Sequence, residues 1–155
     1  MLLFETSIEN SIEINDPDLM KSLFSTICRS GHSEHIKFFL EKDFDVNNED
    51  KNGNTPFFSV CSAGNIEAVR VFIEHATLNN PKPQIHGTTG FYIACSLGHF
   101  NIVSLLLQHR NLFIIDLNAR YNSTGQTPFH AACSKGQLEV VKLLLENAAK
   151  RGIDY

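Results

Sequence analysis

This sequence has no long apolar run and no surplus of basic residues. No uncharged apolar stretch approaches the roughly 20 residues that a membrane-spanning helix needs. The opening run MLLFE meets an acidic residue with no basic residue before it, unlike a secretory signal. Lys and Arg number 13 against 17 Asp and Glu, which leaves no dominant basic surface for nucleic acid. We therefore expect a cytoplasmic protein that binds neither a membrane nor nucleic acid.

The chain does contain an internal repeat, marked by its cysteines. Cys28, Cys61, Cys95 and Cys133 each stand three residues before a glycine, at intervals of 33, 34 and 38 residues. A period near 33 residues indicates one short supersecondary unit stacked on copies of itself. The predicted units span about residues 19–49, 50–83, 84–121 and 122–155.

Short signals within the units predict where helices begin and end. Thr55-Pro56 and Thr127-Pro128 place an N-capping hydroxyl before a proline whose φ angle already suits a helix. In the third unit Thr89 keeps the cap, but Gly90 replaces the proline, which should loosen the start of that helix. A glycine further along each unit can take the left-handed conformation that ends a helix. These glycines are Gly31, Gly64, Gly98 and Gly136.

A second helix is expected after each of these glycines. Its apolar cluster reads VRVFI, IVSLLL or VVKLLL in the later units, which is too apolar for a helix that stands alone. A neighbouring unit has to cover it. The polar stretches DVNNEDKNGN and DLNARYNSTG lie between helix pairs and predict protruding, hairpin-like loops. The expected fold is an all-α solenoid of stacked helix-turn-helix units.

The GQTPFHAA start and the GQLEVVKLLL continuation of the fourth unit resemble the ankyrin repeat. The second and third units match more loosely, and FDVNNED and IDLNAR resemble the linker between repeats of that family. The resemblance covers about residues 19–155 and identifies four repeats, the first of them degenerate. It implies a solenoid that binds other proteins, with no small-molecule substrate and no cofactor.

The cysteines could in principle form disulfides, a zinc site or a catalytic thiol. Equivalent positions in stacked units lie about 8–10 Å apart, whereas a disulfide needs Cα atoms within about 7 Å and zinc needs its ligands around one ion. Cys133 follows His130 by three residues, as an activated thiol could, yet no third orienting group is indicated nearby. We predict free, packed thiols, no metal site and no catalytic residues.

The resemblance implies that a partner binds the concave face of the solenoid, which consists of the loops and the exposed side of each first helix. We expect Ile85, His86 and Leu97 to anchor the partner, because hot spots favour a central patch with a polar rim. For any one residue, ordinary solvated surface is the alternative. The other expected contacts are Lys51, Asn52, Asn54, Thr88, Ser123, Thr124, Gln126 and Lys135.

The two ends carry separate predictions. Phe4, Ile8 and Ile12 recur every four residues among glutamates, which indicates an acidic amphipathic helix within an extension over residues 1–18. It would cap the first unit; a partner-binding segment or disorder is the alternative. The last helix has no clear polar cap, although a solenoid needs polar ends. We therefore expect this chain to be a piece of a longer protein.

These observations together predict a non-catalytic protein-interaction module. A second hypothesis is a regulatory or substrate-recruiting domain of a larger enzyme or effector, with its catalytic part outside this chain. Sequence beyond Tyr155 would separate the two hypotheses.

Overall fold

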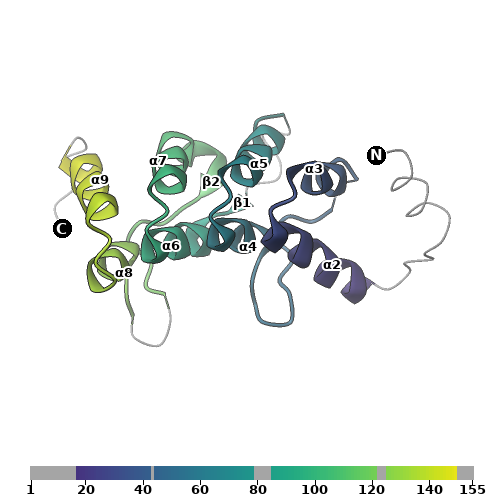
Figure 1. Cartoon of the computed structure of the whole chain (residues 1–155), viewed down its shortest axis with the longest axis horizontal. Helices are drawn as coiled ribbons and strands as arrows, with labels where there is room; N and C mark the ends of the chain where they lie inside the picture. The colour runs from purple at the N-terminus through teal and green to yellow at the C-terminus, as the bar shows by residue number, and fades with distance from the viewer. Residues whose placement is uncertain (1–16, 43, 79–84, 122–124, 150–155) are drawn as a thin grey trace.

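The computed structural model describes residues 17–42, 44–78, 85–121 and 125–149, which form an elongated stack of helix pairs (Figure 1). We call the first helix of each pair an inner helix; these are α2 Pro17–Ser30, α4 Pro56–Ala63, α6 Thr88–Leu97 and α8 Pro128–Ser134. The outer helices are α3 Ser33–Glu41, α5 Ile66–Leu78, α7 Phe100–Gln108 and α9 Leu138–Ala149. Each set forms its own row with neighbours in contact. The predicted all-α solenoid is confirmed.

The predicted capping signals act as expected in the second and fourth units. Thr55 Oγ1 accepts the backbone N–H of Phe58 at 3.1 Å, and Thr127 Oγ1 accepts that of His130 at 3.3 Å. A proline occupies the first turn of both helices. All four turn glycines have φ between 70° and 76°, the left-handed conformation that ends a helix.

The third unit begins differently from the prediction. Helix α6 starts at Thr88 with Gly87 at its N-cap, so the expectation that Thr89 caps this helix is wrong. Gly90 is buried against the second unit: a Cβ there would lie 2.8 Å from Phe57 Cδ1 and 3.1 Å from Cys61 Sγ. The missing side chain therefore lets α6 approach α4 closely, where we had expected it only to loosen the helix start.

Aromatic pairs join the inner and outer helices within a unit. The Phe24 ring stacks on Phe39 with centroids 5.3 Å apart, and Phe57 meets Phe72 edge-on at 5.4 Å. These rings are buried, so they contribute both apolar area and ring–ring geometry to the core between the two rows.

The linkers after the outer helices pair with one another, which the sequence did not predict. Strand β1 (Ile85–His86) runs parallel to β2 (Phe113–Ile114), and the 3-10 helix η1 (Arg110–Leu112) precedes β2. The expected hairpin-like loops are confirmed. The Asp50 N–H donates to the Asn54 carbonyl at 2.9 Å, and the Tyr121 N–H donates to the Gln126 carbonyl at 2.8 Å.

Helix α2 begins at Pro17, two residues before the predicted start of the first unit. The predicted acidic helix around Phe4, Ile8 and Ile12 lies outside the described residues.

Candidate functional site

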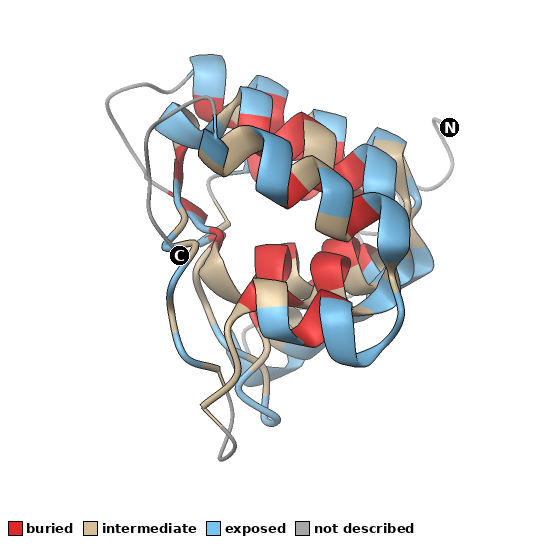
Figure 2. Cartoon of the chain, turned by 90° about the vertical axis from the view of Figure 1, so that its left-hand side faces the viewer, coloured by how far each residue is buried: buried red, intermediate tan, exposed pale blue. Residues whose placement is uncertain are grey.

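The inner face is the surface made by the exposed sides of the inner helices and the loops before them. The loops comprise the described residues 44–55, 85–87, 115–121 and 125–127. Seen along the stack, the buried residues of the two helix rows face each other, and the loops extend away from the inner row (Figure 2). The inner face is thus the part of the fold where loop and helix side chains can contact one partner.

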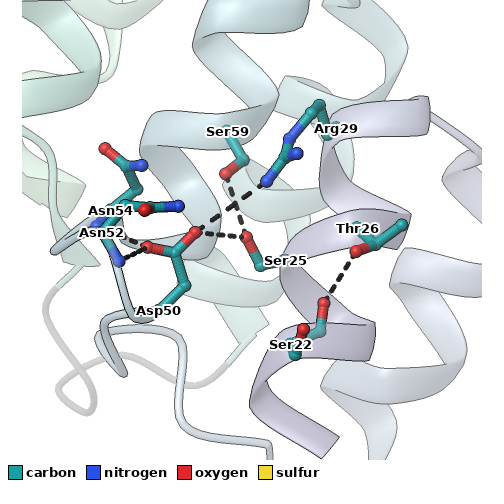
Figure 3. Close-up of polar contacts among 8 residues, drawn as sticks. All are labelled: Ser22, Ser25, Thr26, Arg29, Asp50, Asn52, Asn54 and Ser59. Carbon is teal, nitrogen blue, oxygen red and sulfur yellow. Dashed lines mark hydrogen bonds and ion pairs between the residues drawn. The ribbon is translucent and has the colours of Figure 1, made fainter. Parts of the chain in front are cut away.

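Asp50 joins the loop of the second unit to the inner helix of the first. Its Oδ1 accepts the backbone N–H groups of Asn52 at 2.8 Å and Asn54 at 3.0 Å (Figure 3). Its Oδ2 accepts the Ser25 hydroxyl at 3.2 Å and lies 3.9 Å from Arg29 Nη2. The carboxylate therefore fixes the loop that carries the predicted contacts Lys51, Asn52 and Asn54.

The environment of Asp50 favours its charged form. Burial by itself would raise the pKa of this carboxyl, whose side chain is 6% exposed. The N–H groups of Asn54 and Asn52 and the Ser25 hydroxyl outweigh burial and hold the pKa below its usual value. The charge is therefore part of the folded loop at neutral pH.

A similar contact holds the loop of the fourth unit. Tyr92 occupies the place in α6 that Ser25 occupies in α2, three residues before the cysteine. Its hydroxyl donates to Gln126 Oε1 at 3.3 Å, and its ring lies 4.4 Å from that of Tyr121. Gln126, a predicted partner contact, is therefore half-buried and already engaged within the chain.

The other predicted contacts are placed as follows. Lys51, Asn52, His86, Leu97 and Lys135 are exposed, and Asn54 and Thr88 are half-buried. Ser123 and Thr124 lie outside the described residues.

The expectation that Ile85 is an exposed anchor is wrong. Its side chain is fully buried, opposite Phe113 in the paired linkers. Successive side chains in an extended strand point to opposite sides, so Ile85 enters the core and His86 faces solvent. The polar surroundings of Ile85 in the sequence hid this burial.

His86 is held in place through its backbone. Its N–H donates to the Asn47 side-chain oxygen at 2.9 Å, across two successive linkers. The imidazole remains exposed on the loop side of the inner face.

Leu97 is the main exposed apolar side chain on the inner helices of the middle units, with 46% of its surface accessible. It is the last residue of α6, and half-buried Ile93 lies one turn before it on the same side of that helix. The sequence analysis missed Ile93, although its i, i+4 spacing from Leu97 could have revealed the pair.

A ladder of side chains fixes each unit to the one before it, at the turns between inner and outer helices. Asn65 Nδ2 donates to the Gly31 carbonyl at 2.9 Å, and Gln137 Nε2 donates to the Ser96 carbonyl at 3.2 Å. Between them, His99 Nε2 lies 3.4 Å from the Ser62 carbonyl oxygen. The ladder keeps the inner helices in register, so the inner face is a defined surface.

Three of the four cysteines are packed in the core as predicted. Cys28, Cys61 and Cys95 are buried and free, and burial raises the pKa of each thiol well above its usual range. Cys133 is exposed, so the expectation that it is packed is wrong. The difference arises from position, because α8 belongs to the last described unit and has a following unit on neither helix.

His130 is engaged with its own helix cap. Its Nδ1 lies 2.7 Å from Thr127 Oγ1. Within the part of the chain that the structure describes, no three His, Cys, Asp or Glu side chains come together to hold a metal ion. No helix among the described residues is long and apolar enough to cross a membrane.

The family follows from the repeat geometry and from a match to a family model. The model for ankyrin repeats (three copies) matches residues 3–84, 23–114 and 76–154. This chain is an ankyrin-repeat protein. Ankyrin repeats are generally protein–protein interaction modules, and the fold is typically non-catalytic. No curated protein matches the chain.

Proposed function

We propose that this ankyrin-repeat chain binds a protein partner through its inner face, without catalysing a reaction. Leu97 carries the proposal: it is a large apolar side chain exposed at the end of α6, the third inner helix of four. Ile93 extends the apolar area along the same helix. A patch of this kind is typical of the desolvated centre of an interface.

Polar residues surround this patch on neighbouring elements. Lys135 follows α8, and Lys51 and Asn52 are exposed on the loop before α4. His86 is exposed just before α6. Together they supply the polar rim that gives specificity without burying an unpaired charge.

The compartment proposed for this binding is the cytoplasm. Cys28, Cys61 and Cys95 are free thiols in the core, and reducing compartments keep such thiols reduced.

The test is a pull-down from cell lysate with three baits: the unchanged chain, Leu97→Glu and the control Leu78→Glu. Leu78 is 76% exposed at the end of outer helix α5, so its substitution adds the same charge far from the inner face. We expect Leu97→Glu to reduce capture of a specific protein about tenfold or more, since it introduces a charge into a desolvated contact. Equal capture by all three baits would contradict the proposal.

A further inference from the structure

The described end of the stack at α8 and α9 is an apolar surface. Positions can be compared between units by counting from each cysteine. Cys133 is exposed, whereas its three counterparts are buried. Leu145 is 41% exposed, whereas Leu40, Ile73 and Leu107 at the same position are 9% exposed or less.

Three further positions follow the same pattern. Phe129 and Val141 are half-buried, whereas their counterparts in the other units are fully buried. Gly136 has no atom within 4 Å of the place its Cβ would take, while the His99 ring lies 2.7 Å from the same place at Gly64. We call Phe129, Cys133, Gly136, Val141 and Leu145 the end face. Its residues are those that earlier units bury against the next unit.

The opposite end of the stack does not fit the end face. Leu23 stands where later units have Pro56, Gly90 and Pro128, and Gly90 shows that this junction leaves no room even for a Cβ. His35 stands where later units bury Ala68, Ile102 or Val140. A head-to-tail series of copies would therefore place a bulkier residue and an imidazole in each new junction.

We propose that two copies of this chain associate end face to end face around a two-fold axis. In such a contact one patch meets itself, so both copies cover their apolar surface at once. The nearby charges do not oppose this, because Glu139 and Lys142 form a 2.9 Å ion pair within α9. A following unit would use the same surface in a longer chain, but a chain of these 155 residues provides a second copy. The inner face stays outside the contact, so the dimer presents two of them.

Cys133 makes the arrangement measurable. It is the exposed cysteine, and the other three are buried. In a two-fold contact the two Cys133 thiols face each other across the axis, within reach of a short bifunctional maleimide. In a head-to-tail contact Cys133 would meet α2, whose cysteine is buried.

The experiment combines light scattering after size exclusion, over a concentration series, with maleimide cross-linking of the purified chain. We expect a dimer mass and an efficient Cys133–Cys133 cross-link. Leu145→Glu should raise the dimer Kd about tenfold or more, since it would bury two carboxylates. The control Leu78→Glu should leave the Kd unchanged.

A monomer mass at every concentration would overturn the proposal, as would a dimer that does not cross-link. Both results come from the unchanged chain, so they hold even if Leu145→Glu fails to fold. No partner protein is involved, so the outcome is independent of the function proposed for the inner face.

Discussion

Asp50 and Ile85 show what single residues in the loops contribute and how far sequence reveals it. Asp50 bonds to its own loop and to Ser25, which lies 25 residues earlier. No local pattern announces that long-range contact. Ile85 is an isoleucine among polar residues, and only its pairing with the next linker reveals that it is buried. Contacts made across units therefore decide the roles that local sequence leaves open.

The charge of Asp50 should make stability depend on pH. Its folded-state pKa lies below the ordinary value of 3.8, so the unfolded chain binds a proton more readily. The stabilisation is fully present above the ordinary pKa and is lost as the pH falls through the lower, folded-state pKa.

Asp50→Asn should lower the free energy of unfolding at neutral pH by about 1–3 kcal/mol, because hydrogen bonds to a charged acceptor are replaced by neutral ones. Urea unfolding at a series of pH values should show this difference shrinking as the solution becomes acidic. Glu49→Gln, at an exposed neighbouring carboxylate, should have little effect at any pH. A difference that does not change with pH would contradict the role given to the charge.

At the scale of helices and strands, local signals predicted most boundaries. Thr-Pro pairs start α4 and α8, and glycines of positive φ end the inner helices. The start of α6 was mispredicted because Thr88 Oγ1 donates to the Ile114 carbonyl at 3.1 Å, a contact across 26 residues. The β1–β2 pairing was missed for the same reason: each strand has only two residues, too few to show a period.

The ladder predicts a difference between two chemically identical substitutions. Gly64 and Gly136 both have φ near 70°, so alanine at either should cost about 1–2 kcal/mol in backbone strain. At Gly64 the new Cβ would also displace the His99 ring from the Ser62 carbonyl. Urea unfolding should therefore show Gly64→Ala to be more destabilising than Gly136→Ala by about 1 kcal/mol. Equal losses would mean that the ladder adds nothing to the junction.

At the scale of the whole molecule, the period near 33 residues predicted the stack and its two rows of helices. The period did not predict which surfaces each unit leaves open. Cys133 has nearly the same neighbours in sequence as Cys61 and Cys95, yet it is exposed because of its place at the end of the described stack. Likewise, Leu97 is exposed while apolar residues around it are buried, since it ends its helix.

The central claim is that the inner face binds a protein, and hydrogen exchange tests it most directly. The chain would be compared alone and with the protein captured in the pull-down. We predict slower exchange in the last turn of α6 and in the loop 44–55, while the outer helices α5 and α7 remain unchanged. Slower exchange confined to the outer helices would contradict the account.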